Sequence, residues 1–537
     1  MERNHRARKA SFDATLAAAG ASRLAFHFPF SLLHLHFPVG LILLSIAIAI
    51  PCPAQTPQKI IDEYLRAEGG AKALARIQTA SFAGSIRDET SGENGTYSLI
   101  TKSPNRFYSE ITLEPQHFTQ AHNGMSSWGQ DSACGPHTLT GREATVAEAS
   151  ARYLNGRLAN VRKDKVGLRL VGTENVRGRC AYQVELTLAP GVLREIFFDT
   201  STHLILRETL PPVPNDSSVP DQGGEQFDYD DYRPVNGILE PFHVELRRGG
   251  HTYLITATRV ELNGSVADFI FDFPREEGRP LPDIPALLRD LNKNQKVIEQ
   301  IQRQYTCHLS EEEDKRDSNG QVTSHSVKEY DIFYVADEEV RHLLAKDGKL
   351  LTPTEQHKED ERFNKEFDEL KKKQAEFAND PKKLAKQEEK DEAQISDFLR
   401  GELFTNPHRE RFRGQEVIVF DFGPNPDYKP KKLIDRLIHN LVGVMWVDEK
   451  AHDVARLEAR FSDNFKVAGG LLASLQKGSS FAFEQAMVNN EVWLPSYMEV
   501  HVAARVLFLK ARMSVIDRFS NYKKFEVETR LGPVTPN

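Results

Sequence analysis

The chain has 537 residues, of which 39% are hydrophobic and 27% are charged, and its formal net charge is -8. This composition is typical of a soluble globular protein, and the length predicts about two to four domains. The negative charge excludes a general nucleic-acid binder, because neutralising phosphates requires clustered Lys and Arg. Basic runs such as 371–373 are interleaved with acids, so we expect no nucleic-acid partner.

Residues 1–54 have the pattern of a secretory signal peptide. Basic residues precede the apolar core 41–50, and a small-residue cleavage site follows at Ala54. Cleavage would place the mature protein in the periplasm or outside the cell. A retained N-terminal membrane anchor is the alternative interpretation. A lipid anchor at Cys52 is disfavoured, because Pro51 stands where lipid-attachment sites have a small residue.

The mature chain contains three Cys residues, Cys134, Cys180 and Cys307. An oxidising compartment permits a disulfide between Cys134 and Cys180 within one domain, which would leave Cys307 unpaired. The spacing alone does not establish this pair. No Cys-x-x-Cys sequence is present, which excludes a zinc ribbon and a thioredoxin-type centre.

A helix followed by short strands makes up the first half of the chain. Residues 58–77 carry apolar side chains at helical spacing, and Gly69-Gly70 interrupts the helix. From Ser81 to Pro274, aromatic and β-branched residues alternate with polar ones in short runs, as in strands with one solvated face. A loop rich in Pro, Gly, Asp and Ser separates the strands at 211–226.

The second half of the chain repeats this order. A helix is predicted over 283–305, and strands follow it. An Asp-x3-His-x3-Arg sequence occurs once in each half, at 199–207 and 448–456, and VNGILEP (235–241) is repeated as VNNEVWLP (488–495). These repeats indicate a duplicated unit with hairpin turns at the same places.

A charged segment at 352–404 occurs only in the second unit. Thr352 and Glu355 form a capping box at the start of a predicted helix. Phe363 and Phe367 begin a narrow apolar stripe on that helix, and the sequence Asn-Asp-Pro at 379–381 ends it before a second helix. We interpret the segment as a helical-hairpin insertion. It is either a solvated cover or an arm that docks on a partner.

The acidic residues of FDYDDY (227–232) do not form a paired-carboxylate site. In a strand, Asp228 and Asp230 share one face while Asp231 points away, so we interpret them as solvent-facing residues at a strand end. The repeated Asp, His and Arg favour a turn over a metal site, which needs a further ligand. No nucleophile elbow, Walker A or GxGxxG sequence is present, so no catalytic residue, metal or cofactor is predicted.

The aromatic residues indicate a different kind of site. A curved sheet has an inner face that helices cover only in part. This face is either a filled core or a concave pocket for an acyl chain or a lipidated polypeptide, because such pockets are mostly aromatic and aliphatic. The residues assigned to it are Phe82, Phe107, Phe118, Trp128, Phe197, Phe242 and Tyr253 in the first unit, and Tyr330, Phe333, Phe420, Trp446, Phe483, Trp493 and Tyr497 in the second.

Three stretches of the first unit carry a resemblance: EGGAKALARI (68–77), the hairpin FDYDDYRPVNGILEPFHVEL (227–246) and the terminal ADFIFDFP (267–274). With these stretches the chain resembles the periplasmic outer-membrane lipoprotein-carrier superfamily, which includes LolA/LolB-like and RseB-like proteins. The second unit matches through its opening helix, the DEKAHDVAR turn and VNNEVWLP. The resemblance implies an open antiparallel half-barrel that binds acyl chains inside. It does not place the family's basic ligand contacts on specific positions, and Arg87 and Arg106 are nearby candidates for them.

The predicted fold class is α+β, with two tandem curved antiparallel β half-barrels, covering helices and a charged helical-hairpin insertion. The predicted function is that of a secreted or periplasmic non-enzymatic protein that binds a lipid, a lipoprotein acyl chain or another apolar ligand. A cell-envelope sensor that binds a protein partner, and a hydrolase with an unrecognised site, are the alternatives. Membrane contact is expected to be peripheral or absent. The predicted boundaries are 1–54 for the signal peptide, 56–275 for the first LolA-like domain, 276–283 for the linker, 284–530 for the second domain with its insertion at 352–404, and 531–537 for the tail.

Overall fold

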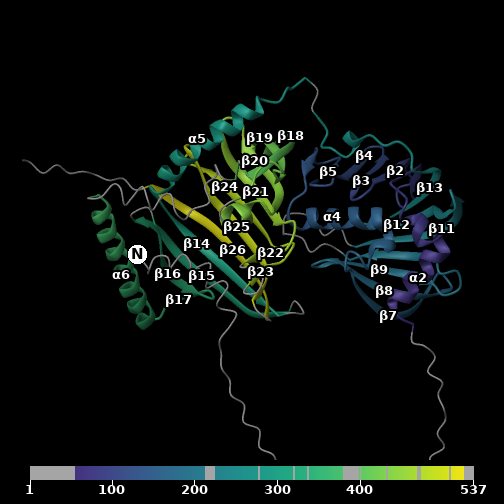
Figure 1. The fold of residues 1–537 in the computed structure, drawn as a ribbon, viewed down its shortest axis with the longest axis horizontal. Coiled ribbons are helices and arrows are strands. Elements are labelled where there is room, and N and C mark those ends of the chain that lie inside the picture. The colour runs from purple at the N-terminus through teal and green to yellow at the C-terminus, as the bar shows by residue number, and fades with distance from the viewer. Residues whose placement is uncertain are drawn as a thin grey trace, which may run out of the picture.

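Two large curved antiparallel sheets with a few covering helices form the protein (Figure 1). The fold is therefore α+β with two tandem half-barrels, as the sequence predicts. The signal peptide, the predicted tail and the helix expected after 381 lie mostly or wholly outside the described residues. The structure is a computed structural model, and it describes residues 55–211, 224–275, 278–317, 321–335, 338–378, 398–399, 401–430, 433–467, 473–506 and 509–524.

The first sheet has 13 strands in the order β6-β5-β4-β3-β2-β1-β13-β12-β11-β10-β9-β8-β7. Its first strand pairs with its last in the middle of the sheet. The strands are β1 (Thr79–Asp88), β2 (Asn94–Lys102), β3 (Arg106–Leu113), β4 (Gln116–His122), β5 (Ser127–Asp131), β6 (His137–Thr138), β7 (Gly167–Val176), β8 (Arg179–Ala189), β9 (Val192–Asp199), β10 (Ile205–Leu210), β11 (Glu225–Val235), β12 (Ile238–Arg248) and β13 (His251–Leu262).

The second sheet follows the same plan in the order β17-β16-β15-β14-β26-β25-β24-β21-β20-β19-β18, with a small β22–β23 hairpin attached to β25. Its first and last strands also pair in mid-sheet. The strands are β14 (Tyr305–Arg316), β15 (Val322–Val335), β16 (Glu338–Lys346), β17 (Lys349–Leu350), β18 (Glu402–Phe412), β19 (Gln415–Pro424), β20 (Leu441–Asp448), β21 (Asp453–Phe461), β22 (Phe465–Val467), β23 (Ala473–Leu475), β24 (Ser480–Val488), β25 (Val492–Val506) and β26 (Leu509–Lys524).

One crossover in each unit carries the chain from one edge of the sheet to the other. In the first unit, α4 and η1 connect β6 to β7, and in the second, the connection from β17 to β18 begins with α6. In the order of elements along the chain, the charged insertion therefore corresponds to α4 of the first unit. The helices are α2 (Pro57–Glu68), α3 (Ala71–Leu74), α4 (Gly141–Gly156), η1 (Arg157–Asn160), η2 (Asp268–Ile270), α5 (Ile284–Gln302), α6 (Pro353–Ala378) and α9 (Leu433–Ile438).

The opening helix of the first unit ends at the predicted break. The Thr56 side chain accepts a hydrogen bond from the backbone N–H of Lys59, at 3.2 Å, and Pro57 is the first helical residue. Gly69 has φ 145° and Gly70 has φ 97°, so the helix stops where the sequence predicts a break. A Cβ on Gly69 would lie 2.7 Å from the carbonyl oxygen of Gly237.

The predicted hairpin turns are confirmed in both units. Asn236 and Gly237 join β11 to β12 with φ values of 51° and 84°. The connection from β24 to β25 is one residue longer, and its Asn489 and Asn490 have φ values of 52° and 55° before Glu491. Positive φ at both central residues is typical of a type I′ hairpin turn. The duplicated VNG and VNN sequences therefore encode one backbone geometry.

The Asp-x3-His-x3-Arg repeats are also turns, as predicted. The Asp199 carboxylate accepts backbone N–H groups from the two residues that start its turn, at 2.6 and 3.0 Å, and Asp448 does the same at 2.8 and 2.7 Å. His203 and His452 then adopt positive φ, at 62° and 52°. Within the described residues, no group of three or more His, Cys, Asp or Glu side chains could hold a metal ion.

The prediction for Asp228 was wrong. Its strand, β11, lies inside the sheet between β10 and β12, and Asp228 is buried instead of solvent-facing. The carboxylate is paired with the Arg207 guanidinium, whose Nη2 donates at 3.0 Å, and Arg177 lies 3.5 Å away. Asp230 and Asp231 are exposed. The buried ion pair explains why an acid occurs in this strand.

The three cysteines are free thiols. Cys134 follows β5 near one edge of the first sheet, and Cys180 lies in β8 near the opposite edge. The predicted disulfide between them is therefore corrected, because the sheet order separates the two residues. Cys307 is buried on β14.

No helix in the part of the chain that the structure describes is both long enough and apolar enough to span a membrane.

Candidate ligand-binding face

The interior of the first half-barrel is filled. Helix α4 lies between the β2–β5 half of the sheet and its β7–β9 half (Figure 1), and its Ala147 and Ala151 pack on Phe107. Helix α2 contributes Ile60 and Ile61 to a second buried cluster. At the other end of the interior, strands from both halves of the sheet pack directly together. That third cluster consists of Ile86, Ile111, Leu113, Leu246, Tyr253 and Ile255.

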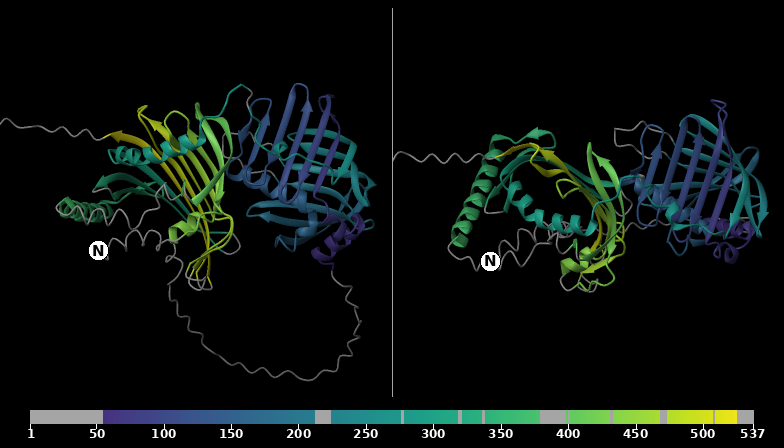
Figure 2. Two further views of the ribbon diagram at one scale, coloured as in Figure 1. Left: turned by 45° about the horizontal axis from the view of Figure 1, so that its top comes forward. Right: turned by 90° about the horizontal axis from the view of Figure 1, so that it is seen from above.

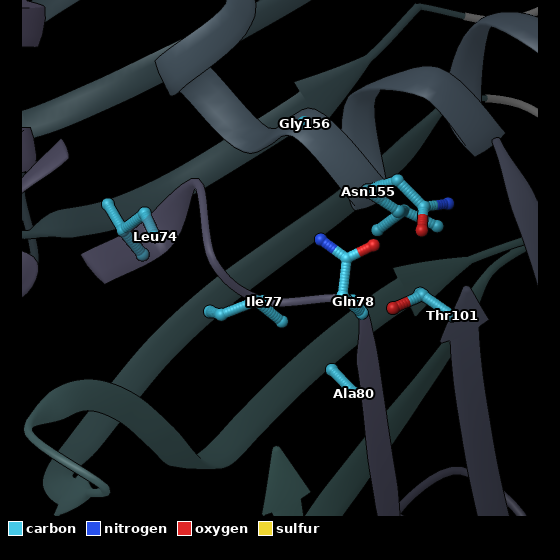
Figure 3. Close-up of a pocket in the computed structure, with 8 residues that line it drawn as sticks. Leu74, Ile77, Gln78, Ala80, Thr101, Asn155 and Gly156 are labelled. Atoms are coloured by element: carbon cyan, nitrogen blue, oxygen red, sulfur yellow. The ribbon is translucent and has the colours of Figure 1, made fainter. Parts of the chain in front are cut away.

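A small cavity remains between these helices and the sheet. It lies beside Leu74, Ile77 and Asn155 (Figure 3), and its volume is about 10 Å³. This volume is about that of one water-sized probe, so the cavity has no room for an acyl chain. Its lining atoms are also more polar than apolar, since Gln78 and Thr101 contribute to the wall.

A buried ion pair fills part of the same interior. Arg194 and Glu208 are bonded to each other and nearly inaccessible to solvent. The Tyr153 hydroxyl on α4 donates to Glu208 at 2.6 Å, and the Arg194 guanidinium lies 4.1 Å from the centre of the Tyr153 ring. Burial raises the pKa of the Tyr153 phenol well above its usual range. These contacts fix α4 on the sheet and leave the pair with a structural role.

Within the part of the chain that the structure describes, a helix covers the second half-barrel at one end only. Helix α5 lies inside the arc of the sheet (Figure 2), where Leu287 and Leu291 pack on Phe420 and Phe422. At its C-terminal end, Ile298 packs on β25 near Leu494. We call the face of the second sheet that α5 contacts the concave face.

Helix α6 does not take the place of α4 on this face. Its Phe363 and Phe367 pack with Phe333 and Val340, which pair across β15 and β16. Gln302 of α5 instead donates to the Tyr334 hydroxyl, at 3.1 Å. Successive residues of a strand point to opposite faces, so α5 and α6 contact opposite sides of the sheet. Among the described residues, α6 therefore leaves the part of the concave face beyond α5 without a covering helix.

Beyond the end of α5, the concave face carries a strip of half-buried apolar side chains. Strand pairing puts them on the same face as the core residues that contact α5, since Phe481 pairs with Ala459 and with Val500. None belongs to the fully buried core, in contrast to the closed cluster at the corresponding end of the first unit. The strip consists of Phe481, Phe483, Met498, Val500, Val502, Met513, Val515 and Phe519.

Charged side chains lie next to the strip on the same face. Glu311 is paired with Arg341 at 2.9 Å and with Lys328 at 3.6 Å, and Arg341 also contacts Glu339 at 2.7 Å. Asp517 stands opposite Glu311 and Met498 in the sheet and is only 2% exposed. Its Oδ1 has no hydrogen-bond partner among the described residues. Burial and the charge of Glu311 raise the pKa of Asp517 to about 6.

About half of the aromatic residues predicted for the inner face lie on it. In the first unit Phe82, Phe107, Phe118 and Tyr253 belong to the interior clusters, and Phe242 lies beneath the Arg233 guanidinium, 4.7 Å away. In the second unit Tyr330, Phe420 and Phe483 face the concave side. Phe483 is the one member of the predicted set that belongs to the strip.

The other predicted aromatic residues lie on the opposite face. This is a correction, and the pairing gives its reason: Trp128 pairs with Ala121, whereas the interior Phe107 pairs with His122. Trp446 likewise pairs with Val419, whereas the interior Phe420 pairs with Met445. The residues on the outer faces are Trp128, Phe197, Phe333, Trp446, Trp493 and Tyr497.

Contact between the two units buries part of these outer faces. The Trp128 indole N–H donates to the Phe271 carbonyl at 3.0 Å, and Phe273 stacks on His408 of β18. Asn123 donates to the Asp421 carboxylate at 2.8 Å, so the first unit bonds directly to the second. Arg460 pairs with Glu148 of α4 at 2.8 Å, and the backbone N–H of Thr138 donates to Glu410 at 3.1 Å.

The two predicted basic ligand contacts are engaged elsewhere. Arg87 is exposed and pairs with Glu89, at 3.1 Å. Arg106 pairs with Asp268 at 3.0 Å, and Lys102 binds the same carboxylate. The Arg106 pair holds the segment that follows β13 against the first sheet. Neither arginine belongs to the strip of the second unit.

A larger pocket opens on the outer side of the second sheet. It has a volume of about 620 Å³ and lies at β14, β15 and β26. His308 and Asp331, which interact at 3.4 Å, form part of its wall. Phe333 is the aromatic residue of that wall, and it packs against Phe363 of α6 with ring centroids 5.5 Å apart. The remaining lining residues are Thr306, Cys307, Asn521, Tyr522 and Lys523. This wall offers no continuous apolar surface.

Sequence reasoning missed most of the strip because it selected aromatic residues. Val500 and Val502 alternate with polar residues in MEVHVAARV, which is a recognisable signal for a strand with one apolar face. Asp517 gave no signal, because an isolated acid in a strand usually faces solvent. Its burial follows only from the neighbours that the folded sheet supplies.

No protein-family model matches the chain, and no curated protein matches it in sequence. Among solved structures, the chain is similar to a LolA superfamily protein from Nitrosomonas europaea, with 16% identity over 41% of this chain and 98% of the other, and a TM-score of 0.28. The chain is also similar to a DUF1329 family protein from Desulfovibrio piger, with 15% identity over 41% of this chain and 98% of the other, and a TM-score of 0.29. For the Pseudomonas aeruginosa MucA/MucB complex the identity is 10% over 87% of this chain and 99% of the other, and the TM-score is 0.16.

Proposed function

We propose that the protein is a non-enzymatic binding protein whose second half-barrel holds an apolar chain, such as the acyl chain of a lipid or lipoprotein. The observation that carries this proposal is the half-buried apolar strip on the concave face of the second sheet. Covering an apolar surface with an acyl chain removes it from water and contributes about 25 cal/mol per Å². The strip offers this gain, whereas the filled first interior does not.

The structural difference between the two units supports the same proposal. We propose the boundaries 56–275 and 284–530 for two domains, of which the first has a helix-filled interior and a structural role. The second differs because its crossover helix α6 packs on the outer face. The N-terminal sequence favours action in the periplasm or outside the cell, where lipid or lipidated protein would be the partner.

A pair of neighbouring substitutions tests the proposal. Val515 faces the strip, and Ser514 points to the opposite face of β26. Titration of the purified protein with a fluorescent fatty alcohol, whose head group carries no charge, should give saturable binding. Val515→Asp should weaken it at least about tenfold, because an ionised carboxylate beside an acyl chain loses hydration without gaining a partner. Ser514→Asp should change the affinity less than about twofold, which is far below the tenfold change that corresponds to about 1.4 kcal/mol of binding free energy.

Native mass spectrometry of gently purified protein is an independent measurement. We expect co-purifying acyl species that are depleted in the Val515→Asp variant and retained in Ser514→Asp. Absence of fatty-alcohol binding by the unmodified protein would overturn the proposal, as would an equal effect of the two substitutions. Circular dichroism of both variants confirms that they are folded.

A further inference from the structure

Asp517 is a buried acid with one carboxylate oxygen that no neighbouring group satisfies. It is 2% exposed, and its Oδ1 has no hydrogen-bond partner in the described part of the chain. Leaving a buried acceptor unpaired destabilises the folded protein, and more so when the group is charged. Such a group in a native structure calls for an explanation, and a bound ligand is one.

The position of Asp517 relates it to the strip. Its side chain points to the concave face, since it pairs with Met498 of the strip on one side and with Glu311 on the other. From Met498 to Val502 the strand runs about 13 Å, at 3.3 Å per residue. Beyond Asp517 in the other direction, Phe519 joins the cluster around Leu309. Asp517 therefore lies where the strip meets the packed core, and Phe519 is the strip residue on the core side.

The charges around Asp517 leave one negative charge uncompensated. Glu311 is shared by Lys328 and Arg341, and Arg341 is shared further with Glu339. Three carboxylates thus face two cations on this part of the sheet when Asp517 is ionised. An additional cation that donates hydrogen bonds would balance the group and would satisfy Oδ1.

We infer that the ligand of the second half-barrel is an amphiphile whose polar end is a primary ammonium group, which donates to Asp517 while its apolar chain follows the strip. This inference rests on the proposed function and adds the chemistry of the head group. An apolar chain lying parallel to β25 and β26 places its polar end at Asp517. An anionic head group would instead meet Glu311 and Asp517 as like charges, at a cost.

Head groups on one common chain test the inference. Dodecylammonium, dodecyltrimethylammonium, dodecyl sulfate and dodecyl maltoside are titrated separately into the full chain below their micelle concentrations, with calorimetric detection. We expect dodecylammonium to bind at least tenfold more tightly than dodecyl sulfate. It should also bind more tightly than dodecyltrimethylammonium, which carries the charge but has no N–H donor. This comparison uses the unmodified protein and does not depend on the folding of a variant.

Two substitutions assign the preference to one carboxyl. Asp517→Asn should lower the ratio of dodecylammonium to dodecyl maltoside affinity at least tenfold. Glu312→Gln is the matched control, because Glu312 pairs with Ile516 and with Val327 on the opposite face. It should leave the ratio unchanged.

The outcomes separate the two proposals. Equal binding of all four probes, tighter binding of dodecyl sulfate, or a ratio unaffected by Asp517→Asn would overturn the head-group inference and leave an acyl-chain site in place. Failure of every probe to bind would overturn the proposed function together with the inference.

Discussion

His203 lies with its Nδ1 3.7 Å from a carboxylate oxygen of Glu63 on α2. The same relationship recurs in the second unit, where Nδ1 of His452 lies 3.7 Å from Asp290 on α5. Each histidine occupies the positive-φ position of its turn, and each carboxylate belongs to the opening helix. The turn and the helix therefore meet in the same way in both units. Because the contacts are partly exposed, they contribute little to the free energy of unfolding, and they serve mainly to orient the turn against the helix.

The buried ion pair of the first unit gives a stability prediction. Glu208→Gln removes the charge that compensates Arg194, so the free energy of unfolding should fall by about 3–5 kcal/mol. Urea unfolding followed by circular dichroism measures the change. The comparison is Glu185→Gln, which removes a pair with the exposed Arg169 and should cost less than about 1 kcal/mol. Similar losses in the two variants would contradict a structural role for the buried pair.

A ring stack contributes to the contact between the units. Phe273 and His408 have ring centroids 3.9 Å apart with an interplanar angle of 16°. A double-mutant cycle with Phe273→Ala and His408→Ala should give a coupling energy of about 1 kcal/mol. Phe269 of the same segment is 75% exposed, so Phe269→Ala should show no coupling to His408→Ala. Zero coupling for Phe273 would mean that the stack does not hold the units together.

A buried carboxyl in the second unit predicts how stability depends on pH. Burial raises the pKa of Glu402 to about 8, from an ordinary value of 4.5, and both carboxyl oxygens lack partners among the described residues. The folded state therefore binds this proton more tightly than the unfolded chain does. The corresponding stability is fully present below pH 4.5 and is lost as pH rises towards 8.

Replacing this carboxyl by an amide should remove that loss. At pH 8.5, Glu402→Gln should be more stable than the unmodified protein by about 1–3 kcal/mol, and at pH 4 the two should be equal. Thermal unfolding across this pH range measures the difference. The exposed Glu361 on α6 provides the control, since Glu361→Gln should leave the pH profile unchanged. A Glu402→Gln profile parallel to that of the unmodified protein would contradict the assignment.

The thiols should differ sharply in reactivity. Cys134 and Cys180 are exposed and free, whereas Cys307 is buried, and burial raises its pKa to about 12. A thiol-specific reagent at pH 8 should therefore modify Cys134 and Cys180 in the native protein and reach Cys307 only after denaturation. Mass spectrometry of the labelled peptides distinguishes the three. Protection of both Cys134 and Cys180, lifted by a reductant, would show that they pair in solution.

Local signals predicted the elements of this fold well. The Gly69-Gly70 break and the turns at Asn236 and Asn490 appear where the sequence predicts them, because each needs only nearby residues. The order of strands in each sheet, with the first beside the last, has no such local signal. Alternation showed that the strands have two kinds of face, but not which face would be covered.

The candidate site was harder to predict for the same reason. Trp128 and Trp446 look like cavity residues because they are large and apolar, yet both lie on outer faces. The segment after β13 contacts Trp128, and Trp446 packs with Trp493 and other residues of its own unit. The position of α6 depends on Phe333 and Val340 being on the outer face, which a single β-bulge between Glu329 and Tyr330 helps to set. Asp517 is an exception to the rule that strand acids are solvated, and such exceptions concentrate at functional sites.

The pairing of β1 with β13, and of β14 with β26, has a consequence for the whole chain. Each unit begins and ends at adjacent strands in the centre of its sheet, so its two ends leave the unit side by side. A segment with neighbouring ends can be copied head to tail or excised without breaking a pairing inside the copy. Each sheet is thus a self-contained unit of the chain. Replacing 352–404 with the α4 crossover is a direct route to a version of the protein with two closed interiors.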